Sequence, residues 1–260
     1  MQVVILCGGK GTRIRGVSDS IVPKPMVPVG SLPILLHIMH NYASAGHTDF
    51  ILCLGYLSDV IKQYFLNYRS MGSDVTVKLG ESPEISYHSS CPEEGWRVTL
   101  ADTGTDTGTG ERIARIEKYL NGNQFMLTYG DGLSNVKLDL LEAKHREHGG
   151  PLTITGVIPP GRFGELTLEG DKVTELREKP PQSGRYINGG FMMINRSFIS
   201  DYLSSIDDDT MLEKGPFERA AQSGDMFMYK HNDFWQCMDT PRDWEYLNQL
   251  AQRENPPWRT

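Results

Sequence analysis

The chain has 260 residues, of which 38% are hydrophobic and 23% charged, a composition typical of a folded protein with a sizeable core. Its formal net charge of −7 argues against nucleic acid or an anionic membrane as a partner, because both bind basic surfaces. We find no apolar run near the roughly 20 residues that span a bilayer and no signal-peptide pattern at the start. The four cysteines have no CxxC spacing, which disfavours a disulfide framework, so we expect a cytoplasmic protein.

The first half of the chain alternates short apolar runs with amphipathic patterns. Strands are expected at 2–7, 49–54, 75–79, 98–101 and 124–129, and helices at 33–45, 58–68 and 111–120, with Ser58 as an N-cap. Strands that alternate with helices form a mainly parallel sheet. Ligands bind beyond the carboxyl ends of such strands, where the glycines after Cys7 and after Tyr129 fall.

The second half is richer in strand patterns. We expect a strand at 152–157, a hairpin of 165–168 with 173–177, a strand at 191–194, and helices near 212–222 and 242–253. The predicted fold is α/β: a Rossmann-like, mainly parallel mixed sheet flanked by helices, with a small β-rich elaboration. No linker divides the chain, so residues 1–260 are expected to form a single domain.

A glycine cluster directly follows the first strand, in the order Gly8-Gly9-Lys10-Gly11-Thr12-Arg13. Glycines let backbone amides approach a phosphate closely, while Thr12 adds a hydroxyl and Arg13 a planar set of donors. The spacing fits neither the Walker loop nor the dinucleotide fingerprint. A plain turn from strand to loop is the alternative that stays open.

Lys24 lies between Pro23 and Pro25, eleven residues after Arg13. Two prolines hold the intervening backbone stiff and extended, which partly fixes the position of the ammonium group. Chemistry at a triphosphate requires fixed cations of this kind. An exposed basic turn is the simpler reading of this segment alone.

Together with several later segments, these motifs closely resemble the sugar-1-phosphate nucleotidyltransferase family across almost the whole chain. The matching segments include Thr128-Tyr129-Gly130-Asp131-Gly132, Glu178-Lys179-Pro180, Ile187-Asn188-Gly189-Gly190-Phe191 and Trp235-Gln236-Cys237-Met238-Asp239-Thr240. The last of them and Pro159-Pro160-Gly161-Arg162-Phe163-Gly164 resemble one branch, the glucose-1-phosphate cytidylyltransferases. The resemblance implies that residues 1–150 mainly bind the nucleotide and 151–260 mainly bind the sugar phosphate and form oligomer contacts.

The resemblance also assigns roles to individual residues. It implies that Asp131 and Asp239 hold Mg²⁺ against the nucleotide phosphate, which suits a hard cation that prefers oxygen ligands. Taken alone, Asp131 is a turn residue and Asp239 precedes a helix start. By resemblance, the catalytic cations are Arg13, Lys24 and Lys179. Nucleotide contacts are implied for Leu6, Gly8, Gly9, Gly11, Thr12, Arg13, Thr109, Gly110, Arg112 and Gly130, and sugar-phosphate contacts for Lys24, Glu178, Lys179, Asn188 and Gly189.

The implied reaction joins CTP to a sugar 1-phosphate without a general base, in a homo-oligomer that is a tetramer or a hexamer. The sequence departs from the branch at Cys7, Leu32, Leu36 and Cys237, where its members usually have alanine, lysine, tryptophan and proline. Another nucleotide or phosphorylated acceptor therefore stays open. A non-catalytic sensor of nucleotide sugars is a third possibility, but it would be expected to lose a charged site residue, and all of them are present.

Overall fold

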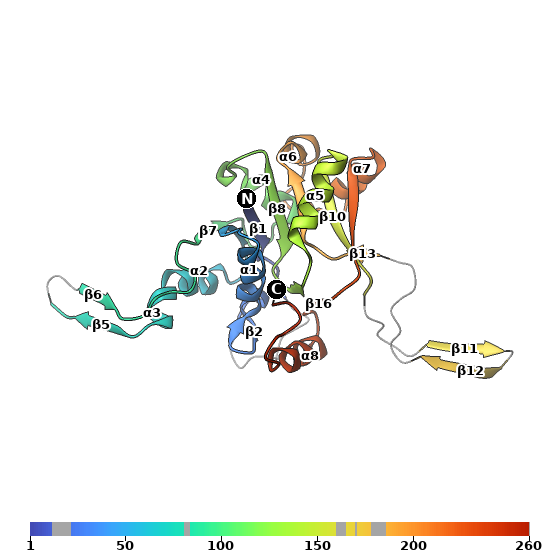
Figure 1. Ribbon diagram of the computed structural model, residues 1–260. Coiled ribbons are helices and arrows are strands. Elements are labelled where there is room, and N and C mark those ends of the chain that lie inside the picture. Colours follow the sequence, from blue (N-terminus) through green and yellow to red (C-terminus); the bar gives the residue numbers. More distant parts are fainter. Residues whose placement is uncertain (12–21, 81–83, 160–164, 170, 178–185, 260) are drawn as a thin grey trace.

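The computed structural model describes residues 1–11, 22–80, 84–159, 165–169, 171–177 and 186–259. Its centre is an eight-stranded sheet in the order β13-β10-β14-β8-β1-β4-β7, with β15 beside β10 (Figure 1). The predicted α/β class with a mixed, mainly parallel sheet is confirmed. Strands from both halves of the chain join the same sheet, so the sheet does not divide the described residues into two bodies.

The parallel half of the sheet carries the edge where ligands are expected. β1 (Gln2–Leu6) pairs parallel with β4 (Asp49–Leu54) and β8 (Gln124–Tyr129), and β4 pairs parallel with β7 (Arg97–Asp102). Their carboxyl ends therefore lie at one edge. The strands expected at 2–7, 49–54, 98–101 and 124–129 are confirmed, with ends that shift by one residue at β1 and β7. The strand expected at 75–79 ends at Lys78 and lies outside this sheet, in a separate antiparallel hairpin.

The other half of the sheet is mixed. β10 (Leu152–Val157) is parallel to β15 (Met226–His231) and antiparallel to β14 (Met192–Asn195) and β13 (Ile187–Asn188). β14 is also antiparallel to β8, which joins the two halves. Gly190 (φ 75°) and Phe191 (φ 47°) lie in the short connection between β13 and β14, and both have a positive φ.

The residues of β1 alternate between two cores. Val3 and Ile5 belong to one core and Val4 and Leu6 to the other, so both faces of the sheet are covered. The first core receives α1 (Ile34–Ser44), α5 (Leu138–His148) and α8 (Pro241–Ala251). The second receives α4 (Thr109–Arg115), α6 (Ser197–Tyr202) and α7 (Pro216–Gln222).

Two hairpins leave the body of the molecule (Figure 1). The first is made by β5 (Val75–Lys78) and β6 (Glu84–Tyr87), after α2 (Ser58–Leu66) and α3 (Tyr68–Gly72). The second is made by β11 (Glu165–Glu169) and β12 (Lys172–Arg177), where the sequence predicts it. The remaining short elements are η2 (Lys24–Met26), β2 (Pro28–Val29), β3 (Leu32–Pro33), η3 (Glu117–Tyr119), β9 (Gly132–Ser134) and β16 (Trp235–Cys237).

Three helix predictions are corrected by the structure. The helix expected at 58–68 ends at Leu66, and its N-cap is Leu57 (φ 53°) rather than Ser58, because the backbone turns left-handed one residue earlier. The helix expected at 111–120 starts at Thr109 and breaks into a 3-10 turn after Arg115. The helix expected near 212–222 begins only at Pro216, since proline favours the first helical turn.

Candidate active site

A cavity of about 1230 Å³ opens beside the carboxyl end of β8. Asp131, Asn188, Gly189 and Asp239, four of the residues predicted for the site, line its wall. Trp235 also lines it, and its indole Nε1 donates to the Gly189 carbonyl at 2.8 Å. The cavity therefore brings together residues that the sequence spreads over more than a hundred positions.

A small two-stranded sheet places the two aspartates side by side. β9 and β16 are antiparallel, with Gly132 opposite Cys237, so Asp131 precedes one strand and Asp239 follows the other at the same end. The Met238 amide donates to the Asp131 carbonyl at 2.9 Å. The Asp239 amide donates to Asp243 at 3.1 Å in the first turn of α8, where Thr240 is the N-cap.

The Lys24 ammonium lies between these two carboxylates. Its Nζ is 2.6 Å from Asp131 Oδ2 and 2.5 Å from Asp239 Oδ1, and the side chain is 14% exposed. Burial by itself would lower the pKa of Lys24, but the charges and hydrogen bonds of Asp131 and Asp239 outweigh it and hold that pKa above its usual value. One cation thus balances two anions, which leaves a net negative charge on the wall of the cavity.

The backbone at Lys24 is less extended than the sequence predicts. Pro23 is extended (φ −66°, ψ 149°), but Lys24 begins a 3-10 turn in which Pro25 takes an early helical position and the Met26 amide donates to the Pro23 carbonyl at 2.8 Å. A Cβ at Gly11 (φ 55°) would lie 3.0 Å from Lys24 Cβ. Gly11 of the glycine loop therefore lies directly against the lysine.

The glycine loop rests on a buried arginine. Arg112, only 4% exposed, donates to the carbonyl oxygens of Gly8 (3.3 Å), Leu54 (3.1 Å) and Gly104 (2.7 Å) and to two further oxygens in 103–105. A Cβ at Gly8 would lie 2.3 Å from its guanidinium, so only glycine fits there. The guanidinium therefore ties together the carboxyl ends of β1, β4 and β7. Its nucleotide contact stays a prediction.

Other predicted loop residues lie on either side of this arginine. Around Gly9 space is open, since a Cβ there would meet no atom within 4 Å. The Gly130 amide donates to the Leu6 carbonyl at 3.1 Å, and a Cβ at Gly130 would lie 3.0 Å from Pro25. Leu6 and Gly130 are thus bound to each other next to the loop, while the space around Gly9 is open.

The start of α4 is covered by the segment 207–215. The sequence predicts that amides here face the nucleotide, but the Gly110 amide donates to the Thr210 carbonyl at 2.9 Å. Thr109 Oγ1 accepts from the Leu212 amide at 2.7 Å and donates to Glu213 Oε2 at 3.0 Å. In this arrangement the Gly110 amide is not available to a nucleotide, because the covering segment supplies its acceptor.

Four predicted site residues, Thr12, Arg13, Glu178 and Lys179, lie outside the described residues. Three residues that the sequence does not single out contribute to the site. Tyr129 and Trp235 line the cavity, and Glu213 bonds to Tyr129 and Thr109. Tyr129 and Trp235 lie within the quoted family motifs, so these motifs could have pointed to them in the sequence. Glu213 lies in none of the quoted motifs.

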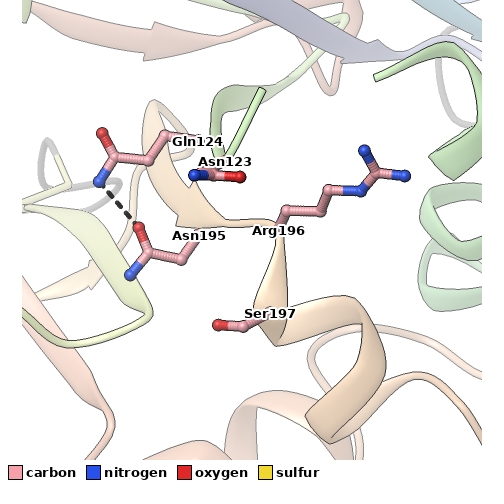
Figure 2. A pocket seen from close by; sticks show the side chains of 5 residues that line it. All are labelled: Asn123, Gln124, Asn195, Arg196 and Ser197. Atoms are coloured by element: carbon pink, nitrogen blue, oxygen red, sulfur yellow. Dashed lines mark hydrogen bonds between the residues drawn. The ribbon is translucent and has the colours of Figure 1, made fainter. Parts of the chain in front are cut away.

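A second cavity of about 690 Å³ is excluded as the active site (Figure 2). Gln124 and Asn195, two of its lining residues, join through a hydrogen bond of 2.9 Å, and Gln124 begins β8, at the edge of the sheet opposite the glycine loop. Arg196 points away from both in Figure 2, and its guanidinium donates to Glu117 at 3.2 Å. Arg196, the charged residue that lines this second cavity, is therefore already paired with a carboxylate.

Comparison with known proteins agrees with this geometry. The family model described as nucleotidyl transferase matches residues 2–249. The chain belongs to the nucleotidyl transferase family. A relative from Salmonella typhi named glucose-1-phosphate cytidylyltransferase is 43% identical, over 100% of this chain and 99% of its own length. A Bacillus subtilis relative named probable glucose-1-phosphate cytidylyltransferase is 38% identical over 100% and 99%.

Solved structures share the nucleotidyl transferase fold. The crystal structure of HddC from Yersinia pseudotuberculosis superposes with a TM-score of 0.67 at 22% identity, covering 96% of this chain and 99% of that one. This likeness shows the fold, while the family model and the two relatives confirm the family that the motifs indicated. Among the described residues, no helix is both long and apolar enough to cross a membrane.

Nucleotidyl transferases generally use a divalent metal ion. Asp131 and Asp239 fit such an ion, because their hard carboxylate oxygens already share one cation, the Lys24 ammonium. Within the described part of the chain, no group of three or more histidine, cysteine, aspartate or glutamate side chains could hold a metal. Two carboxylates completed by substrate phosphates are a common arrangement for Mg²⁺.

Proposed function

We propose that the protein transfers the cytidylyl group of CTP to α-D-glucose 1-phosphate, giving CDP-glucose and pyrophosphate. The end-to-end match to relatives named for this activity supports the choice of substrates. The observation that carries the proposal is the Lys24 ammonium between Asp131 and Asp239, two residues that line a large cavity, with Gly11 of the glycine loop against the lysine. This arrangement suits the meeting of two phosphate-bearing substrates.

In this proposal Asp131 and Asp239 hold Mg²⁺. When bound, the ion would position the α-phosphate of CTP and neutralise charge that develops on it. Lys24 supplies a fixed positive charge between the two substrates and so offsets the repulsion between their phosphates. These three residues are the proposed catalytic centre.

Transfer is a single displacement at the α-phosphorus. An oxygen of the sugar phosphate attacks in line, and the bond to pyrophosphate breaks as the new phosphorus–oxygen bond forms. No general base is required, because the attacking phosphate is already ionised near neutral pH. We assign Arg13 and the amides of Gly8, Gly9, Gly11 and Thr12 to the β- and γ-phosphates, where they stabilise the leaving group.

The sugar phosphate is assigned to the other side of the cavity. Asn188 and Gly189 lie at its wall and offer an amide and a close backbone approach to sugar hydroxyls. Lys179 is assigned to the phosphate and Glu178 to the sugar. Thr109 and Arg112 are assigned to the nucleotide side, with Arg112 acting from beneath the loop through the Gly8 carbonyl. Gly110 is assigned there only as part of the α4 backbone, because its amide is bound to the Thr210 carbonyl.

Pyrophosphate release tests the proposed substrates. With Mg²⁺ present, CTP and glucose 1-phosphate are expected to react about a hundredfold faster than pairs with UTP, dTTP, ATP or GTP, because a polar site rejects the wrong hydrogen-bonding pattern strongly. Equal rates with another nucleotide or another sugar phosphate would replace the named substrates. No release with any pair would favour a sensor of nucleotide sugars.

A changed substrate preference would be sought first at Cys7, at the edge of the glycine loop, and next at Cys237. The Cys237 thiol lies at the cavity wall, 3.8 Å from Asp239 Oδ2, and burial raises its pKa to about 12, with Asp239 adding to the effect. The thiol therefore stays protonated and neutral near pH 7. It occupies the position where the cytidylyltransferase branch usually has proline.

We also propose that residues 1–260 act as one domain in a cytoplasmic homo-oligomer, a tetramer or a hexamer. All four cysteines are free, as in a reducing compartment. The arm formed by α2, α3, β5 and β6 exposes large apolar side chains, with Leu66 78% and Leu79 87% exposed. An exposed apolar hairpin with open strand edges is a frequent site of association between chains.

If the arm forms the oligomer interface, charged side chains introduced on it are expected to dissociate the oligomer. Replacing Val77 and Ile85, which pair across the hairpin, by lysine is expected to split the oligomer into species of about the 29.2 kDa chain mass. Light scattering after size exclusion measures this. Leu140→Lys, on the exposed side of α5, is the control and should leave the mass unchanged. An unchanged mass in the double variant would place the interface elsewhere.

A further inference from the structure

Glu213 joins two elements that carry predicted site residues, the start of α4 and the end of β8. It lies in the segment before α7, far in sequence from either partner. One carboxylate oxygen accepts from Thr109 Oγ1 at the start of α4 (3.0 Å), and the other accepts from the hydroxyl of Tyr129 at the end of β8. The helix start on the nucleotide side and the strand end at the cavity therefore share one carboxylate.

The carboxylate sets the direction of every hydrogen bond in this network. An ionised carboxylate only accepts, so both hydroxyl protons must point toward Glu213. Thr109 Oγ1 is then left to accept from the Leu212 amide at 2.7 Å, and Tyr129 Oη to accept from Asn188 Nδ2 at 3.0 Å. Asn188 Oδ1 in turn accepts from the Gly190 amide at 2.9 Å. The orientation of the Asn188 amide follows from these assignments.

The far end of the network reaches the wall of the cavity. Tyr129, Asn188 and Gly189 line it, and the turn after them contains Gly190 and Phe191 with positive φ angles of 75° and 47°. A positive φ is unfavourable for phenylalanine, so contacts on both sides of the turn must hold it. Asn188, bound to Tyr129 and to the Gly190 amide, is one such contact.

We propose that Glu213 is a positioning residue that aligns Asn188 for the sugar phosphate and Thr109 for the nucleotide at the same time, which couples the binding of the two substrates. The proposal rests on the proposed function for the identity of the substrates. It adds a residue from outside the predicted motifs and an energetic link between the two halves of the site.

The coupling through Glu213 is tested by whether a substitution on one side of the site changes the KM of the substrate on the other side. Tyr129→Phe removes the hydroxyl on the sugar side, and Thr109→Val removes the one on the nucleotide side. If Glu213 couples them, each variant raises the KM of the opposite substrate about threefold in addition to that of its own, because members of one network are not independent. Glu213→Gln, which retains the shape but not the charge, is expected to raise both KM values about tenfold.

Equilibrium binding separates positioning from a loss of stability. Calorimetric titration of glucose 1-phosphate, with and without a non-hydrolysable CTP analogue, is expected to show about tenfold tighter binding with the analogue in the wild type and no enhancement in Glu213→Gln. Glu147→Gln, at an exposed ion pair on α5, is the control and keeps the enhancement. If Glu213→Gln does not fold, the cross-effects of Tyr129→Phe and Thr109→Val decide.

Two outcomes overturn the proposal: changes confined to the substrate on each variant's own side, or an unchanged binding enhancement in Glu213→Gln. A wild type that binds both ligands with enhancement but releases no pyrophosphate would instead refute the proposed function and leave the role of Glu213 supported.

Discussion

Lys24→Met is expected to lower kcat/KM by about a thousandfold, comparable to the loss of a fixed group that stabilises charge in a transition state. Methionine retains most of the side-chain length but leaves the carboxylates of Asp131 and Asp239 without the cation that lies 2.6 and 2.5 Å from them. Initial rates of pyrophosphate release at saturating Mg²⁺ measure the effect. Turnover within about threefold of the wild type would contradict the proposed role, since it would leave almost no stabilisation to assign.

Asp131→Asn and Lys24→Met are expected to change the affinity for the metal ion in opposite directions. Removing Lys24 takes away a cation that competes for the carboxylates, so Lys24→Met is expected to bind Mn²⁺, used as a spectroscopic substitute for Mg²⁺, more tightly than the wild type. Asp131→Asn removes a ligand and is expected to bind Mn²⁺ about tenfold more weakly. Asp201→Asn on α6 serves as the control. Changes of the same sign in both variants would show that Lys24 and the ion do not share this site.

Arg112→Met is expected to lower the free energy of unfolding by about 3 kcal/mol, because several buried oxygens lose a charged donor. A single hydrogen bond to a charged group contributes about 1.5–3 kcal/mol, and the bonds of one side chain are not additive. For a chain of this size a loss of about 3 kcal/mol corresponds to a melting temperature about 6–12 °C lower. Calorimetry measures it, and kcat/KM should fall as well because the Gly8 carbonyl loses its support.

A matched surface arginine controls for the change of charge. Arg146→Met removes an exposed i,i+4 ion pair with Glu142, which typically contributes only about 0.3–0.5 kcal/mol. Its melting temperature should stay within about 2 °C of the wild type. If Arg112→Met melts as the control does, the guanidinium is not what holds the strand ends together.

The parallel core of the fold could be predicted because its signals are local. The apolar runs of β1, β4, β8 and β10 are bounded by turn residues, and their predicted limits agree with the structure to within a residue. α5 was missed, because only Leu138, Leu141 and His145 are buried on it and charged residues interrupt the pattern. β15 was missed for a similar reason, since only His231 of its residues is fully buried.

For the site, the residue types could be predicted but not their arrangement. The family motifs point to Lys24, Asp131 and Asp239, yet the pairing of β9 with β16 that brings the aspartates together depends on contacts between distant strands. The same holds for Glu213, which shows no motif and acquires a role only because its segment folds over α4 and β8. Arg112 illustrates the limit differently: the resemblance implies a nucleotide contact for it, but nothing in the sequence shows that its buried guanidinium donates to the carbonyl oxygens of Gly8 and Gly104.

The central claim, that an oxygen of glucose 1-phosphate attacks the α-phosphorus of CTP, is tested most directly by isotope position. Glucose 1-phosphate with heavy oxygen throughout its phosphate is incubated with CTP, Mg²⁺ and the protein, and the products are analysed by mass spectrometry. We expect CDP-glucose that retains all of the label and pyrophosphate that carries none. Label in the pyrophosphate, or pyrophosphate without a nucleotide sugar, would contradict it.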